Sequence, residues 1–215
     1  MKKGVLVVAV ALLLVAFIPR PVAAAIDFGW GVKGGLSLAS SKWSDDSSAS
    51  KLLGKPVFGA FIAFNLNKSF AIQPEVYFLT QGGIYTYESL EEITYKYIDT
   101  YKYLHIPVLA KLRLMPDKKL TPIVFAGPAV GVLLSAHYKM FVNGAEEVDK
   151  NVKTWFKSTN FSLVFGGGVE YKLDKLMLVL DVRYDLGLAN IDKSDMPNPD
   201  TLKTKALMFM VGVGF

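Results

Sequence analysis

The chain has 215 residues, of which 52% are hydrophobic and 20% are charged, and its formal net charge at pH 7 is +5. It contains no cysteine, which excludes disulfide bonds and a lipid-attachment cysteine. After the N-terminal segment no run of about 18 apolar residues occurs, which excludes a transmembrane helix in that part of the chain.

The N-terminal segment has the layout of a secretory signal peptide. Lys2 and Lys3 precede an apolar run from Val5 to Ile18, and small residues follow up to Ala25. We therefore predict a signal peptide over residues 1–25 and one mature domain over residues 26–215; the short apolar run disfavours an uncleaved anchor. Basic residues of this segment supply part of the positive charge, so no nucleic-acid partner is indicated. A secreted enzyme and an outer-membrane protein both fit these features.

Eight segments alternate apolar and polar residues with a period of two, which is typical of β-strands with one apolar and one polar face. The pattern is clearest in residues 176–188, where every even position is apolar and the odd positions include Asp181, Arg183 and Asp185. Residues 121–136 are nearly all apolar and small, so the pattern does not assign their faces. In chain order, the predicted strands span residues 26–40, 55–66, 70–80, 101–114, 121–136, 161–173, 176–188 and 206–215.

The connections between these segments alternate in length. Short turns follow the second, fourth and sixth segments, whereas long polar connections follow the others at residues 41–54, 81–100, 139–160 and 189–205. Outer-membrane barrels have short periplasmic turns and long external loops, whereas a soluble sandwich has no reason to segregate its loops. We therefore predict an all-β fold, an eight-stranded antiparallel up-and-down transmembrane β-barrel in the outer membrane of a Gram-negative bacterium. Outer-membrane lipid is the expected partner of its apolar face.

Several short motifs resemble the PorT-type outer-membrane β-barrel domain. They are Gly31–Leu36, Gln73-Pro74-Glu75, Tyr103–Pro107, Phe125–Pro128, Gly166–Glu170 and the terminal Phe215. The resemblance covers residues 26–215 and implies an architecture similar to the small OmpA and OmpX barrels. It specifies the fold better than the activity, and the role of PorT in protein secretion is not carried over. Phe215 resembles the end signal read by the barrel-assembly machinery, which is therefore an expected partner.

Charged residues fall on the face predicted to line the barrel interior. A small barrel holds only side chains or one small ligand, and an isolated buried ion is unfavourable by several kcal/mol, so these charges must be paired. A two-residue turn at Asp174-Lys175 would place Gly166 opposite Arg183 and Gly168 opposite Asp181. We predict a plug of salt bridges, with a narrow small-solute channel as the alternative. The predicted network comprises Lys33, Glu75, Lys111, Arg113, Glu170, Asp181, Arg183 and Asp185; Asp27 and Lys172 share its face.

Candidate catalytic and metal-binding residues are few. Ser135 and His137 share a strand face, and His105 has Asp99 nearby in sequence, but a hydrolase needs a nucleophile, a base and an orienting group in contact. The acidic residues of 189–205, namely Asp192, Asp195 and Asp200, lack the spacing of a calcium loop. We predict no enzyme activity, no metal site and no cofactor site, and keep an envelope hydrolase as the less favoured alternative.

Tyrosine is concentrated in and beside the second long connection. Tyrosine supplies rigid contact area with a polar tip, and it is enriched at binding surfaces and at membrane interfaces. The pattern therefore indicates either a hairpin extending beyond an aromatic girdle or an external binding loop for an unknown ligand or protein. We predict a structural or interaction role through the external loops. The candidate contact residues are Trp43, Tyr85, Tyr87, Tyr95 and Tyr97.

Overall fold

The computed structural model describes residues 27–43, 50–89, 92–193 and 201–215, so the predicted signal peptide lies outside the described residues. Within these ranges the chain forms strands and one short 3-10 helix, η2 (Lys153–Trp155). No helix in the described part of the chain is long and apolar enough to cross a membrane. The strands are β1 (Asp27–Trp43), β2 (Leu53–Asn65), β3 (Phe70–Glu88), β4 (Thr94–Arg113), β5 (Leu120–Val142), β6 (Ala145–Asn151), β7 (Thr159–Lys172), β8 (Met177–Gly187) and β9 (Leu202–Gly214).

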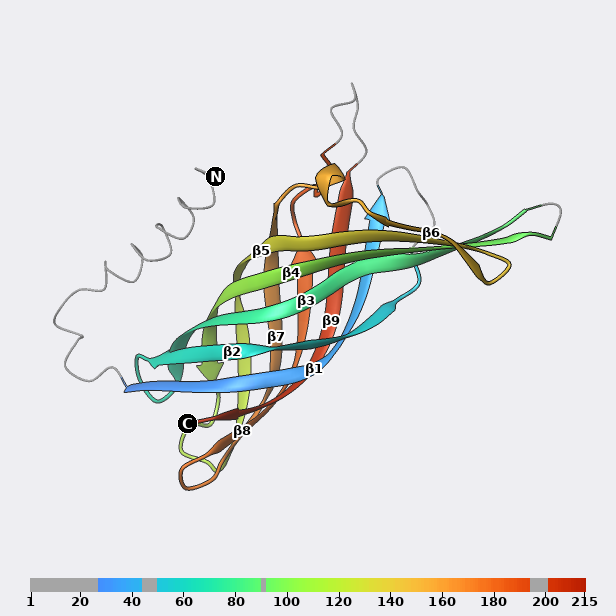
Figure 1. Cartoon of the computed structure of the whole chain (residues 1–215). Helices are drawn as coiled ribbons and strands as arrows, with labels where there is room; N and C mark the ends of the chain where they lie inside the picture. The colour runs from blue at the N-terminus through green and yellow to red at the C-terminus, as the bar shows by residue number, and fades with distance from the viewer. Residues whose placement is uncertain (1–26, 44–49, 90–91, 194–200) are drawn as a thin grey trace.

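Eight of these strands close into a ring (Figure 1). All pairings are antiparallel, in the order β4-β3-β2-β1-β9-β8-β7-β5, and β4 pairs with β5 to complete the circle. This confirms the predicted up-and-down fold. The one remaining strand in the described residues, β6, pairs with β5 outside the ring. It lies within residues 139–160, where the sequence predicted a loop.

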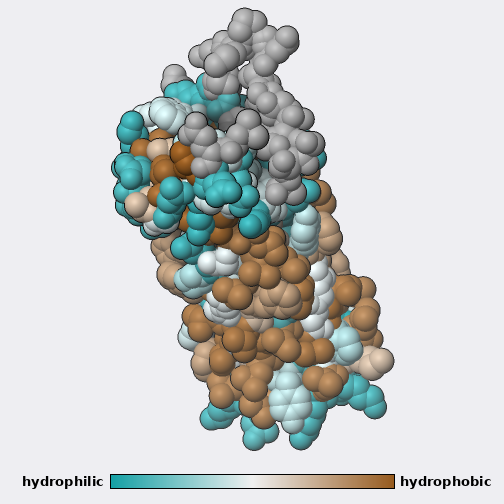
Figure 2. Space-filling model, turned by 90° about the vertical axis from the view of Figure 1, so that its right-hand side faces the viewer, coloured by the Kyte–Doolittle hydropathy of each residue, from teal (hydrophilic) through white to brown (hydrophobic). Residues whose placement is uncertain are grey.

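Alternation along each strand separates an apolar outer face from a mixed inner face. In β8 the even residues Leu178, Leu180 and Val182 are exposed, whereas Asp181 and Arg183 are buried. On the face that Figure 2 shows, the exposed apolar residues form a broad brown band, with polar residues at both ends. The structure also assigns the faces of β5: Ile123, Phe125, Ala129 and Leu133 point inward, and Val124, Val132 and Leu134 point outward.

Three strands continue beyond the ring and form a projecting arm. The β2–β3 ladder ends at the pair of Phe58 with Phe78, and the β5–β7 ladder ends at Val132 with Thr159. Past these points β3, β4 and β5 stay paired with one another, β6 adds to β5, and one isolated bridge links Lys51 to Ile84 (Figure 1). We call residues 81–88, 94–102 and 135–151 the external arm. The predicted long loop at 81–100 is therefore mostly a β-hairpin.

The opposite end of the ring carries the short connections. Residues 66–69, 114–119 and 173–176 join consecutive strands there. Phe215 lies at the same end, where its backbone exchanges two hydrogen bonds with Trp30 and its ring stacks on the Trp30 ring with centroids 4.8 Å apart. We call this the turn end of the barrel and the other the arm end.

Candidate functional site

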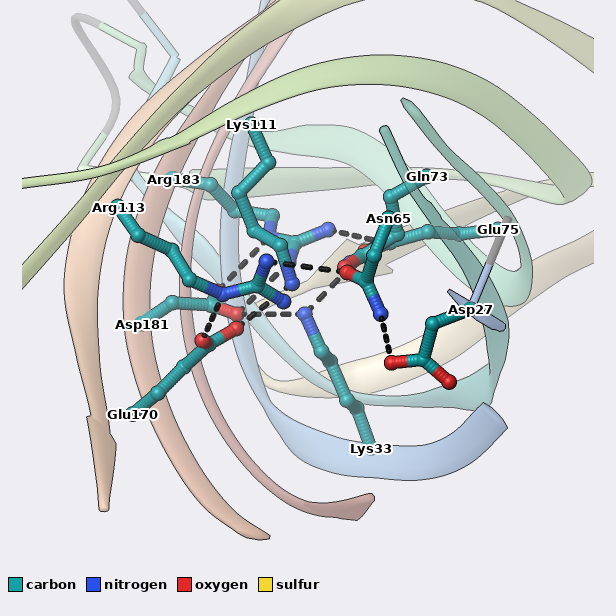
Figure 3. Close-up of polar contacts among 10 residues, drawn as sticks. All are labelled: Asp27, Lys33, Asn65, Gln73, Glu75, Lys111, Arg113, Glu170, Asp181 and Arg183. Carbon is teal, nitrogen blue, oxygen red and sulfur yellow. Dashed lines mark hydrogen bonds and ion pairs between the residues drawn. The ribbon is translucent and has the colours of Figure 1, made fainter. Parts of the chain in front are cut away.

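Four charged side chains meet at the centre of the lumen (Figure 3). Arg183 on β8 donates from Nε and Nη2 to the two carboxylate oxygens of Asp181, each at 2.8 Å, and from Nη1 to Glu75 on β3. Lys33 on β1 donates to Asp181 Oδ2 at 2.9 Å and to Glu75 Oε1 at 3.2 Å. All four side chains are almost fully buried. This central cluster contains two cations and two anions, so its formal charges balance.

Glycines on the neighbouring strand make room for this cluster. Gly166 lies opposite Arg183 and Gly168 opposite Asp181, as the turn at residues 174–175 predicts. A Cβ on Gly166 would approach Val182 O to 2.3 Å and Arg183 Cα to 2.8 Å, closer than real Cβ contacts. The guanidinium carbon of Arg183 lies 5.0 Å from the centre of the Phe125 ring, within range of a cation–π contact.

A second group, the turn-side cluster, lies nearer the turn end of the barrel, where β4 and β7 end. Figure 3 shows its side chains together with those of the central cluster. Glu170 on β7 accepts hydrogen bonds from Lys111 Nζ at 2.6 Å and from Arg113 Nε at 2.7 Å, both on β4. Arg113 Nη1 also donates to Asn65 Oδ1 at 3.0 Å, and Asn65 Nδ2 donates to Asp27 Oδ2 at 3.2 Å. Asn65 was missed by sequence reasoning because it is uncharged and ends its strand. Lys172 is exposed and donates to Pro116 O, outside the cluster.

A third group, the loop-side cluster, surrounds Asp185 toward the arm end. Asp185 Oδ2 lies 2.9 Å from His105 Nε2 and accepts a hydrogen bond of 3.2 Å from Ser162 Oγ. Gln81 Nε2 donates to Asp185 Oδ1 at 3.4 Å, and Gln81 Oε1 accepts from Asn160 and Thr204. Gln81, Asn160, Ser162 and Thr204 are inward polar residues without charge, so the charge pattern of the sequence did not indicate them.

The contacts of His105 do not match those of a catalytic triad. Ser162 Oγ lies 3.2 Å from His105 Nε2, the same nitrogen that contacts Asp185, and His105 Nδ1 has no hydrogen-bond partner. A relay needs the nucleophile on one ring nitrogen and the orienting carboxylate on the other. The imidazole is also 1% exposed, so a substrate bond has no access to it.

The other candidate catalytic residues, which the sequence analysis did not favour, do not assemble. His137 lies on the arm, half-buried, with Nδ1 3.5 Å from Asp149 Oδ1. Ser135 pairs across the ladder with Lys102, and His105 contacts Asp185 rather than Asp99. Among the described residues no group of three or more His, Cys, Asp or Glu side chains could hold a metal ion. Asp195 and Asp200 lie outside the described residues.

Apolar side chains cover the arm end of the lumen. Val152, Ile191 and Leu202 come from connections and strand ends, and each is at most 3% exposed. Phe156 packs edge-on against Tyr101 with ring centroids 4.8 Å apart, and Lys157 N donates to Ile191 O at 2.8 Å. In the sequence, the residues that cover the lumen were visible only as isolated apolar residues within polar connections. This apolar cap consists of Tyr101, Tyr103, Leu133, Ala136, Val152, Ile191 and Leu202, with Tyr138 and Phe156 against it.

The candidate contact tyrosines lie on one face of the external arm. Tyr85 is paired with Tyr97, and Tyr87 with Tyr95, across the β3–β4 ladder. The Tyr87 and Tyr95 ring centroids are 6.4 Å apart, and Tyr97 stacks near Tyr138 at 6.0 Å. Tyr87 is 63% exposed, whereas the Tyr85 hydroxyl lies 2.9 Å from Ser41 Oγ. Trp43 is the last residue of β1, and its side chain lies outside the described part of the structure.

One carboxyl group on the arm has an altered protonation equilibrium. Asp99 lies on β4 between Gly83 and Tyr138, beyond the apolar band. Burial raises the pKa of Asp99 from its usual 3.8 to about 6, because desolvation disfavours the charged form. The charge on this part of the arm therefore changes close to neutral pH.

A cavity of about 760 Å³ opens at the turn end. Its walls include Trp30, Phe61 and Met177, and Arg113 of the turn-side cluster lies at its inner surface. The surrounding charges are mixed: Lys68 pairs with Asp117 at 2.8 Å. The lining therefore shows no excess of one charge sign that would favour a particular ligand.

The comparison with family models agrees with this architecture. The family model described as outer membrane protein beta-barrel domain matches residues 20–193. No curated protein matches the sequence. Among solved structures, Ail of Yersinia pestis is 14% identical with a TM-score of 0.44, covering 88% of this chain and 100% of Ail. OprG from Pseudomonas aeruginosa is 11% identical with a TM-score of 0.46, covering 88% of this chain and 95% of OprG.

Proposed function

Because the chain belongs to the outer membrane protein beta-barrel domain family and lies in the outer membrane of a Gram-negative bacterium, we propose that it is a closed, non-enzymatic barrel acting through its external arm. The observation that carries this proposal is the order of the lumen contents. The turn-side, central and loop-side clusters and the apolar cap follow one another along the axis, and buried side chains form most of each. Outer-membrane barrels have short periplasmic turns and long external loops, so the turn end would face the periplasm and the arm would face outward.

The ion pairs support a plug rather than a conduction path. A conducting pore needs mobile ions to exchange with its wall charges, whereas Arg183 and Asp181 are held in a bidentate contact that satisfies both partners. Lys33 is a second cation in this cluster, and it forms ion pairs with the carboxylates of Asp181 and Glu75. Breaking these contacts to pass an ion would leave buried charges unpaired.

The tyrosine face of the arm supports an interaction role. Paired tyrosines outside the apolar band present large, rigid contact area with polar tips, a composition common at protein interfaces. The arm contains no described constellation of nucleophile, base and orienting group, so chemistry is not part of the proposal. The partner of the arm is an external ligand or protein. The proposal also includes the barrel-assembly machinery as the partner that reads Phe215. It further includes a relationship to the PorT-type domain.

Single-channel recording tests the plug. Refolded residues 26–215 inserted in a planar bilayer should give no discrete conductance steps, while the same sample shows the heat-dependent gel mobility of a folded barrel. The matched variant Arg183→Ala with Lys33→Ala removes both cations of the central cluster and should be the more conductive protein. Steady conductance of the unmodified protein would favour the alternative, a narrow small-solute channel.

Site-specific photocross-linking tests the arm. A photoreactive amino acid is placed at position 87 or 95 in cells, and at position 180 on the lipid-facing side of β8 as a control. The proposal expects a discrete adduct from the arm positions that is absent at position 180. Folded, surface-exposed protein that gives no adduct at either arm position would contradict the interaction role.

A further inference from the structure

Three lysines extend outward where the apolar band ends at the arm end. Ser41, Leu202 and Thr204 are buried on the inner face of β1 and β9. The residues that alternate with them, Lys42, Lys203 and Lys205, therefore point outward and are exposed. On the same outer faces, toward the turn end, the exposed residues are apolar and include Leu36, Phe209 and Val211.

These lysines repel one another within the sheet. Lys42 lies directly opposite Lys203 in the β1–β9 ladder, and Lys205, opposite Ser40, is two residues further along the same face. Like charges directly opposite each other destabilise an antiparallel pair. No described acidic residue forms an ion pair with any of the three, whereas exposed Lys68 and Lys139 each have a carboxylate partner. The patch therefore lacks a counter-charge within the described residues.

The position of the patch indicates which anion can supply that charge. In a bilayer, headgroup phosphates lie at the edge of the hydrocarbon region, the level at which the apolar wall residues give way to these lysines. Lysine presents a compact ammonium group on a flexible apolar stem, which can lie along the wall while the charge reaches the headgroups. Basic clusters beside a membrane-spanning segment attract anionic lipids for this reason.

We propose that Lys42, Lys203 and Lys205 form a binding site for the phosphate groups of anionic lipids in the outer leaflet. The proposal rests on the membrane location of the barrel and not on the plug or on the role of the arm. The lipid occupies the outer surface of β1 and β9, with its acyl chains against Leu36, Phe209 and Val211 and its phosphate between the lysines.

Lipid selectivity in reconstituted vesicles tests this site. The protein is placed in phosphatidylcholine vesicles with a trace of spin-labelled phosphatidylglycerol or spin-labelled phosphatidylcholine, and the motionally restricted fraction of each label is measured. We expect a several-fold preference for phosphatidylglycerol that decreases with added salt. The variant K203S/K205S should lose most of this preference. The matched control K150S/K153S removes two exposed lysines away from the band and should keep it. Equal selectivity of K203S/K205S and the unmodified protein would overturn the proposal.

Two further measurements distinguish other sources of the anion. If free phosphate were the ligand, inorganic phosphate would raise the thermal midpoint in pure phosphatidylcholine vesicles more than chloride at equal ionic strength, without any phosphatidylglycerol preference. If carboxylates of residues 44–49 or 194–200 paired with the patch, K203S/K205S would lower the midpoint in pure phosphatidylcholine. The lipid proposal expects an unchanged or higher midpoint there, because the variant relieves repulsion. A midpoint raised by inorganic phosphate without a phosphatidylglycerol preference would overturn the lipid proposal. A lower midpoint of K203S/K205S in pure phosphatidylcholine would overturn it as well.

Discussion

Arg183 on β8 lies directly opposite Gly166 on β7, and this pairing lets a guanidinium group enter the lumen of a narrow barrel. The missing side chain at Gly166 leaves space beside the arginine backbone, and the guanidinium then reaches Glu75 on the far wall. One cation thereby joins two strands that are distant in the ring order. The contact depends on both residues, because a larger residue at 166 would displace the strand that carries the arginine.

Replacing Arg183 with alanine should destabilise the barrel. Asp181 and Glu75 would keep only Lys33 as a cationic partner, and breaking a buried ion pair from one side typically decreases the free energy of unfolding by about 3–5 kcal/mol. Denaturant unfolding in detergent, followed by gel mobility, measures the loss. Lys175→Ala at the exposed turn is the control and should leave stability unchanged. If Arg183→Ala unfolded at the same denaturant concentration as the unmodified protein, the central cluster would not stabilise the fold.

Replacing Gly166 with alanine tests the space beside Arg183. The new Cβ would overlap Val182 O at 2.3 Å, and neither strand can move without disturbing the ladder, so we expect a loss of about 1–3 kcal/mol. Gly54→Ala is the matched control, since a Cβ there meets only Leu38 Cδ2 at an ordinary 3.7 Å. Thermal midpoints measured side by side give the comparison. Equal midpoints for the two variants would show that β7 and β8 can separate at little energetic expense.

The period-two pattern predicted the ring and its inner charges because lipid contact forces one face of each strand to be apolar. In β8 this contrast separates Leu180 from Asp181 without ambiguity. The contrast disappears in the outer part of the external arm, which lies beyond the lipid-facing wall and where Tyr87 and Lys96 are exposed. Tyr87 and Lys96 therefore gave no strand signal, and β6 was not predicted. Buried contacts such as that of Ile191 with the apolar cap join distant segments, which no local pattern encodes.

Asp99→Asn should change how the stability of the arm depends on pH. The folded pKa of Asp99 is about 6, above its usual 3.8, so the folded state holds the proton more tightly than the unfolded state. The burial penalty on the charged carboxylate is thus fully present above about pH 6 and is relieved as the pH falls toward 4. The neutral variant should be more stable than the parent by up to about 3 kcal/mol near pH 8 and equal to it near pH 4.

Protease cleavage of the arm at several pH values measures this difference, because cleavage reports the population of opened arm. Asp149→Asn is the control, since Asp149 is on the same arm but its pKa is lowered by its hydrogen bond with Lys139. The control should show no stabilisation at high pH. A constant difference between Asp99→Asn and the parent across the pH range would contradict a raised pKa at Asp99.

Deleting Phe215 should slow insertion in cells more than refolding in detergent. Phe215 is 55% exposed at the turn end, and its ring stacks on Trp30 while its backbone extends the β1–β9 pairing by two hydrogen bonds. If its role were only to stabilise the barrel, assembly in cells and refolding of purified protein would decline together. If the assembly machinery reads the terminal aromatic residue, assembly in cells should decline several-fold with little change in refolding. Phe209→Ser, another exposed apolar residue on β9, is the control for lost lipid contact. Normal insertion without Phe215 would rule out its role as an assembly signal.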